Sequence, residues 1–190
     1  FDLLRAWGAE TVPFSPMHGR LPDADGYILG GGYPEMFGRE LESNAAMREA
    51  IREVSRNGTP VYAECGGLMY LTDEIRTEKG WQGRSEEAVC EMCGVFSGST
   101  RIPARRIVSY VEGEALPGSP LGSGTFRGHE FHYSDVALDA GTRYVFRLTR
   151  GVGISGGWDG ALVDRTLASY LHLHPLASRG LLERFVAACR

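Results

Sequence analysis

The chain has 190 residues, of which 43% are hydrophobic and 23% are charged, and its formal net charge is −4. This length and composition suit one globular domain over residues 1–190 with a single substantial core. Because the basic residues are dispersed and no segment resembles a membrane-spanning helix or a signal peptide, we expect a cytoplasmic protein without a nucleic-acid or membrane partner.

The first third of the chain alternates strand and helix signals. Short apolar runs predict buried strands, at residues 11–14, 26–29 and 60–63. A helix is expected to follow Asn44, which can cap it, and to end at Asn57-Gly58, and a second helix is expected from Gly66. Alternating strands and helices predict a parallel sheet covered by helices.

The middle of the chain has a different pattern. Runs separated by Gly, Pro and Asp turns predict antiparallel strands, at residues 105–112, 126–134 and 143–149. A last strand is expected at residues 166–173 and a closing helix at 176–189, while the glycine-rich residues 151–157 predict a mobile loop. The expected fold class is α/β, with a mostly parallel central sheet flanked by helices and additional antiparallel strands.

Cys65 lies between a predicted buried strand and a predicted helix. That order resembles a nucleophile elbow, in which a sharp turn lifts the side chain clear of the sheet and small neighbours prevent a clash. The start of the helix favours the negatively charged thiolate, and the N–H groups beginning at Gly66 can face an oxyanion. The alternative is a buried, inert cysteine, which the Gly66-Gly67 pair disfavours.

Cys90 and Cys93 have the spacing of half a zinc site. No second pair of suitably spaced ligands completes it, so we expect no metal and interpret both as ordinary thiols. The chain has four cysteines, which is too few for a disulfide framework.

A second glycine-rich segment, residues 29–35, also follows a predicted strand. The carboxyl ends of parallel strands converge on one crevice, so this loop is expected beside Cys65. The N–H groups of Gly31 and Gly32 can then approach a substrate carbonyl, as an oxyanion hole requires. Taken alone, the segment is equally well explained as a turn before a helix that Pro34 opens.

A thiolate nucleophile needs a base, which is usually histidine. The candidates are His18, His129, His132, His172 and His174. His18 lies in a polar loop, and His132 is expected to share a strand face with Glu130. His172 and His174 are expected to point to one side of the last strand as a pair. The residues alone leave the choice of base open.

Four segments, which span nearly the whole chain in a fixed order, carry a resemblance: residues 30–35 (GGGYPE), 63–71 (AECGGLMYL), 128–134 (GHEFHYS) and 167–174 (LASYLHLH). They resemble the class I, or triad, glutamine amidotransferases, and within them the cobyrinic acid a,c-diamide synthase type. The resemblance implies a flavodoxin-like class I fold. It also implies that the chain hydrolyses glutamine through a thioester on Cys65 and supplies the ammonia to a synthetase.

The same resemblance implies roles for particular residues. By motif position His172 is the base, and Gly32 and Gly66 supply the N–H groups for the oxyanion, with Gly31 beside them. His174 and His132 are candidate auxiliary residues. The Glu130 carboxylate is expected either to orient an imidazole or to hold substrate.

In the whole enzyme of this family, an N-terminal domain that uses ATP and magnesium activates the a and c acetate groups of a corrinoid-type tetrapyrrole. That domain is absent from this chain, which begins at Phe1, so we expect a piece of a longer protein. No cofactor is expected in this domain, and its partners are glutamine, the N-terminal synthetase domain and, in the full enzyme, the tetrapyrrole.

Two positions depart from the wider class. Most triad amidotransferases carry Glu two residues after the catalytic histidine, where this chain has His174, so the sequence predicts a Cys-His dyad without an orienting carboxylate at that place. The position two before Cys65 is often Gly and is Ala63 here, which is small enough to keep the turn.

Other interpretations remain open from the sequence. Related synthases act on hydrogenobyrinic acid or nickel sirohydrochlorin, and another amidating synthetase could act on a cell-wall precursor. A catalytically idle docking domain would keep the same fold. A cysteine hydrolase of small amides or peptides would also fit the loop at Gly30.

Overall fold

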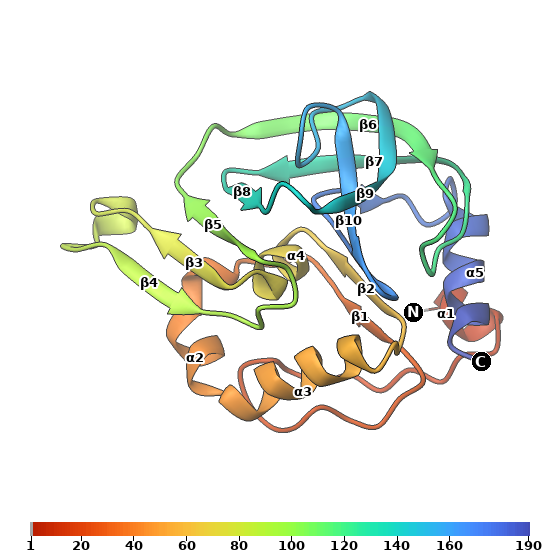
Figure 1. Ribbon diagram of the computed structural model, residues 1–190, viewed down its shortest axis with the longest axis horizontal. Helices are drawn as coiled ribbons and strands as arrows, with labels where there is room; N and C mark the ends of the chain where they lie inside the picture. The colour runs from red at the N-terminus through yellow and green to blue at the C-terminus, as the bar shows by residue number, and fades with distance from the viewer. Residues whose placement is uncertain (1) are drawn as a thin grey trace.

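Two β-sheets form the framework of the protein in the computed structural model, which describes residues 2–190 (Figure 1). The larger sheet has the strand order β1-β2-β11-β10-β9-β6-β7-β12, with the bounds Tyr27–Leu29, Val61–Glu64, Thr166–Ser169, Trp158–Val163, Arg143–Arg150, Ile107–Ala115, Gly124–His132 and His172–Leu173. The smaller sheet has the order β4-β3-β5-β8, with the bounds Ala88–Glu91, Glu74–Thr77, Gly98–Ile102 and Asp135–Leu138.

The α-helices are α1 to α5, with the bounds Asp2–Ala6, Gly38–Ser43, Ala45–Arg56, Gly66–Leu71 and Arg179–Ala188. Short 3₁₀ helices, η1 and η2, span Pro34–Met36 and Trp81–Gly83. α1 contacts α5, so the two ends of the described chain lie side by side (Figure 1). None of the helices described within residues 2–190 has the length and apolar character needed to cross a bilayer.

Alternate residues of β2 face two separate hydrophobic clusters. Val61 packs with residues of α3, whereas Tyr62 packs with Phe185 of α5. Successive side chains of a strand point to opposite faces, so this part of the sheet is covered by a helix on each side. The expected α/β class is therefore confirmed, and the predicted helix after Asn44 is α3, capped by the Asn44 side chain.

Within the larger sheet, parallel pairing is confined to one end, where β2 lies between β1 and β11. In the smaller sheet, β3 and β5 are also parallel. The remaining pairs of the larger sheet are antiparallel, from β11 through β10, β9, β6 and β7 to β12. The sheet is therefore mixed, and the expectation that it is mostly parallel was wrong in this respect. A parallel pair needs a long crossover, whereas β6 and β7 are joined by residues 116–123 and β10 and β11 by residues 164–165.

Two predicted strands differ in the structure. Residues 11–14 form no strand, because Val12 is exposed and Pro13 has no N–H group to donate. The predicted strand at residues 166–173 is divided into β11 and β12 by Tyr170 and Leu171. The other predicted strands are confirmed, with bounds that shift by up to three residues.

β11 and β12 lie far apart in the sheet order although only Tyr170 and Leu171 separate them in sequence. The sheet must therefore curl until its β12 edge returns toward β2 and β11. The backbone N–H of Leu173 donates to Glu64 Oε1 at 3.1 Å and joins the two parts. This closure brings β7 and β12 beside the carboxyl end of β2.

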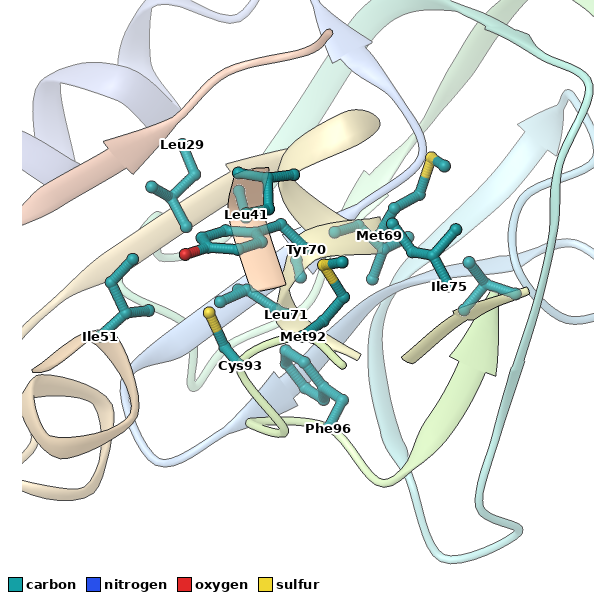
Figure 2. Packing of buried hydrophobic residues seen from close by; sticks show 14 of the residues in the cluster. Leu29, Leu41, Ile51, Met69, Tyr70, Leu71, Ile75, Met92, Cys93 and Phe96 are labelled. Atoms are coloured by element: carbon teal, nitrogen blue, oxygen red, sulfur yellow. The ribbon is translucent and has the colours of Figure 1, made fainter. Parts of the chain in front are cut away.

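Helix α4 passes through the larger hydrophobic cluster, and all of its residues are buried. Figure 2 shows Tyr70 and Leu71 of this helix among core residues that include Met92 and Cys93. Burial raises the pKa of Cys93 to about 12, so this thiol stays protonated and packs as an apolar group. Because α4 is enclosed by the core, the residue that precedes it is held in a fixed place.

Candidate active site

Cys65 occupies the sharp turn between β2 and α4 that the sequence predicts. Its backbone has φ 47° and ψ −101°, a conformation that a residue with a side chain rarely adopts. Its N–H donates to the Ser169 carbonyl at 2.7 Å, and its carbonyl accepts the Met69 N–H at 3.1 Å. These bonds hold the strained turn, and the side chain is 7% exposed.

The glycine loop after β1 lies directly against the start of α4. A Cβ atom built on Gly66 would come within 2.8 Å of both the backbone N and O of Gly32. A Cβ on Gly31 would overlap Cε1 of the His172 ring. The sequence prediction that this loop adjoins Cys65 is confirmed, and both glycines are needed because no space remains for side chains.

His172 lies between Cys65 and a carboxylate. Its Nδ1 atom is 3.3 Å from Glu64 Oε2, and its side chain is 24% exposed. A hydrogen bond with Cys65, followed by one with Glu64, raises the pKa of His172 to about 10 against the opposing effect of burial. The imidazole therefore holds its proton at neutral pH.

Glu64 is a site residue that the sequence analysis missed. It directly precedes Cys65, and its Oε1 accepts the Tyr62 hydroxyl at 2.5 Å and the Leu173 N–H at 3.1 Å. The position two residues after His172 carries no carboxylate, as the sequence shows, but the expected Cys-His dyad is incomplete, because the Glu64 carboxylate at the end of β2 contacts the His172 ring. The available signal was an acidic residue at the carboxyl end of a buried strand, next to the cysteine.

His174 does not pair with His172. It is exposed, lies beyond the end of β12, and its Nδ1 accepts the Ala177 N–H at 3.3 Å in the turn before α5. The expected pair on one strand face was wrong because β12 ends at Leu173. His174 therefore stabilises a local turn.

His132 is buried and stacks on the Tyr170 ring, with centroids 3.8 Å apart. Its Nδ1 lies 3.0 Å from the Ser134 carbonyl oxygen. His129, from the same strand, stacks on the His172 ring at a centroid distance of 4.9 Å and pairs with His172 across β7 and β12. His129 is thus the histidine that contacts the His172 ring.

Glu130 is fully buried. Its carboxylate accepts the N–H groups of Val152 at 2.7 Å and Gly153 at 3.1 Å. Burial opposes its ionisation, but the nearby His132 imidazole and these two backbone bonds lower the pKa of Glu130. The carboxylate therefore holds the start of the glycine-rich loop, and its Oε2 atom lies 3.8 Å from Nε2 of the His132 imidazole.

A small pocket opens beside Cys65. Three parts of the chain line it: the loop from Gly32 to Glu35, Cys65 with Met69, and residues 131–134. Cys65 Sγ lies 3.8 Å from the Phe131 carbonyl oxygen. Glu35, which the sequence analysis did not single out, is 4% exposed and contributes a carboxylate to this lining.

Cys90 and Cys93 lie in the core and do not adjoin this pocket. Within residues 2–190, no group of three or more His, Cys, Asp and Glu side chains is arranged to hold a metal ion.

The chain is similar in sequence to several cobyrinate a,c-diamide synthases. The chain is 44% identical to the cobyrinate a,c-diamide synthase of Methanosarcina acetivorans over 98% of its length and 39% of that protein. It is 42% identical to the synthase of Methanosarcina barkeri, over 100% of this chain and 40% of that protein. It is 41% identical to the synthase of Listeria monocytogenes, over 91% of this chain and 38% of that protein. The chain thus spans about 40% of the length of these relatives.

Solved structures show the same fold. PurLQS from Thermotoga maritima matches with a TM-score of 0.61 and 14% identity, over 90% of this chain and 83% of the other. A glutamine amidotransferase matches with a TM-score of 0.50 and 19% identity, over 87% of this chain and 78% of the other. The class I fold is therefore confirmed. Because residues 1–180 also match the family described as "CobB/CobQ-like glutamine amidotransferase domain", the chain belongs to that family.

Proposed function

We propose that this chain is the glutamine-hydrolysing part of a synthetase that amidates the a and c acetate groups of cobyrinic acid. Cys65 is the nucleophile and His172 is its acid and base. The observation that carries this proposal is the placement of Cys65 at a strained elbow beside Gly32, together with the His172 ring, which packs against Gly31 and is held by Glu64 at 3.3 Å. The names of the relatives, which are cobyrinate a,c-diamide synthases, support the acceptor.

The first half of the reaction forms a thioester. The Cys65 thiolate attacks the side-chain carbonyl carbon of glutamine, and the negative charge moves to the oxygen. The N–H groups of Gly32 and Gly66 stabilise that oxyanion. The His172 imidazolium gives its proton to the nitrogen as the carbon–nitrogen bond breaks, so ammonia leaves and a glutamyl thioester remains.

The second half regenerates the thiolate. Neutral His172 takes a proton from water, and the resulting hydroxide attacks the thioester carbon. The carbon–sulfur bond breaks, glutamate leaves and His172 is again protonated. Glu64 holds the imidazole by Nδ1 and stabilises its positive charge in both halves, the role that a carboxylate has in a catalytic triad.

ATP and magnesium belong to the part of the enzyme outside this chain. The glycine-rich residues 151–157 lie between β9 and β10 and lead into a strand, whereas a phosphate-binding loop leads into a helix. They do not fit a nucleotide phosphate, and we assign no step of the ATP chemistry to this chain. Its partner in that chemistry is the synthetase domain, which receives the ammonia.

The test uses the full-length protein with glutamine, ATP, magnesium and cobyrinic acid. Cys65→Ala should abolish glutamate release and keep amide formation from added ammonium, because only the ammonia source is lost. Cys189→Ala, which removes a thiol at the C-terminal end of α5, is the matched control and should keep both activities. Glutamine-dependent amidation by Cys65→Ala would refute the role of this residue.

The acceptor is tested separately. If amides form only on hydrogenobyrinic acid or nickel sirohydrochlorin, the glutaminase assignment stands and the assignment of cobyrinic acid is wrong. If the wild-type protein amidates with ammonium but releases no glutamate from glutamine, the domain is a docking unit. If it releases ammonia from many small amides but amidates no acceptor, it is a hydrolase.

A further inference from the structure

Glu35 places a carboxylate in the pocket beside Cys65. It lies on η1, directly after the glycine loop, and its side chain is 4% exposed. Oε1 accepts the Tyr133 hydroxyl at 2.7 Å. Among the residues that the structure describes, no donor reaches its second oxygen, Oε2, although Oε2 is not sealed from solvent. One oxygen is thus held by the protein while the other is available to a molecule in the pocket.

The charge of Glu35 has no partner in the protein. Within the described chain, no Lys, Arg or His nitrogen lies within ion-pair distance of its carboxylate. Burial, followed by the hydrogen bond to Glu35 and its charge, raises the pKa of Tyr133, so that phenol stays protonated and donates. A nearly buried carboxylate without a cation is costly, and a ligand that brings a positive group offsets this cost.

A free amino acid brings such a group. Glutamine carries an α-ammonium group and, further along the molecule, the carboxamide that Cys65 attacks. Apart from Glu35, the side chains around the pocket are apolar, hydroxyl, thiol or imidazole groups, and none is Lys or Arg. The negative carboxylate of Glu35 therefore gives the pocket a preference for the cationic end of the substrate.

We propose that Glu35 binds the α-ammonium group of glutamine and so selects the free amino acid over carboxamides that lack this group. This inference rests on the proposed glutaminase function and adds the residue that recognises the substrate. Tyr133 is the positioning residue, because its hydroxyl fixes the carboxylate. The ammonium group is remote from the reacting carbon, so its contact is equally strong before and during the reaction and affects mainly KM.

The experiment compares two substrates in the full-length protein: L-glutamine and glutaramate, which is glutamine without its α-amino group. Wild-type protein should prefer L-glutamine in kcat/KM by about 10- to 100-fold, the size of a charge-assisted hydrogen bond. Glu35→Gln should raise KM for L-glutamine by a similar factor and leave kcat/KM for glutaramate unchanged. Tyr133→Phe, which keeps the charge, should produce a smaller loss with the same substrate dependence.

A purely structural role would give a different result. An equal loss of activity toward both substrates in Glu35→Gln would overturn the proposal while leaving the glutaminase function intact. If that variant did not fold, the wild-type comparison would still decide, since equal use of L-glutamine and glutaramate contradicts ammonium recognition. Absence of glutamine hydrolysis in the wild-type protein would overturn the proposed function, and the role of Glu35 with it.

Discussion

The Glu64 carboxylate and the His172 imidazole meet at 3.3 Å although 108 positions separate them in the chain. Glu64 also accepts the N–H of Leu173, the neighbour of His172, so one carboxylate holds both the ring and the backbone that carries it. Cys65, the proposed nucleophile, follows Glu64 directly. The end of β2 therefore carries both Cys65 and the carboxylate that contacts His172.

Glu64→Gln tests this arrangement. The amide keeps the shape and can accept from Nδ1, but it lacks the charge that stabilises the imidazolium. We expect kcat for glutamate release to fall by about 10- to 100-fold, less than the ~10⁴-fold loss seen when a serine-protease triad loses its carboxylate. Glu49→Gln, at an exposed position on α3, is the control and should retain wild-type kinetics. Equal kinetics in both variants would contradict an orienting role for Glu64.

The protonation of His172 gives a second prediction. Its pKa is raised from 6.5 to about 10, chiefly by Cys65, so the ring should remain protonated at pH 8. An NMR titration of labelled histidine should show this, and Cys65→Ala should shift the titration of His172 toward lower pH. A wild-type midpoint near 6.5 would argue against the paired thiol and imidazole.

The same shift has a consequence for stability. Because the folded-state pKa lies above the ordinary value, the stabilisation is fully present below pH 6.5 and is lost as pH rises toward about 10. We expect the difference in free energy of unfolding between wild type and His172→Gln to shrink over this range. Chemical denaturation at several pH values measures it, and a difference that grows with pH would have the wrong sign.

Gly31 offers a steric test with a control in the same loop. The methyl group of Gly31→Ala would overlap the His172 ring and displace it, whereas Gly30→Ala meets nothing within 4 Å. A displacement of about 1 Å can cost on the order of 100-fold in rate, so we expect kcat to fall by about 10- to 100-fold in Gly31→Ala. Gly30→Ala should stay near wild type. Steady-state glutamate release distinguishes the two, and similar rates would show that the ring tolerates the methyl group.

Substitutions of His172 and His174 should have very different effects on kcat. His172→Ala removes the group that moves protons and should lower kcat by at least the ~100-fold typical of general acid–base catalysis. His174→Ala removes an exposed side chain that caps a turn and should leave kcat nearly unchanged. Glutaminase assays at saturating glutamine compare them. A larger loss in His174→Ala would reverse the assignment of the base.

Local sequence signals predicted the parts of the site that local geometry forms. The elbow at Cys65 follows from a buried strand, a cysteine and two glycines, and the nearby loop at Gly31 follows from the convergence of parallel strand ends. Both lie where the sequence placed them. The assignment of His172 came from a family motif, because spacing alone did not distinguish it from His174.

The parts that sequence did not predict depend on long-range closure of the sheet. Tyr170 and Leu171 separate β11 from β12. The pairing of β12 with β7 cannot be predicted from local residue propensities. The role of Glu64 depends on that pairing, because only the curled sheet brings His172 beside it. For Glu130, the motif suggested a place in the site. In the structure its carboxylate accepts the backbone N–H groups of Val152 and Gly153.

The two-residue strand β12 also affects when the domain becomes active as it folds. The contact from Leu173 to Glu64 spans 109 positions, and contacts of such long range carry a large entropy of loop closure. Until that contact forms, Cys65 has neither its proton donor nor its carboxylate partner. The site is therefore complete only when β12 has paired with β7 and Leu173 has contacted Glu64.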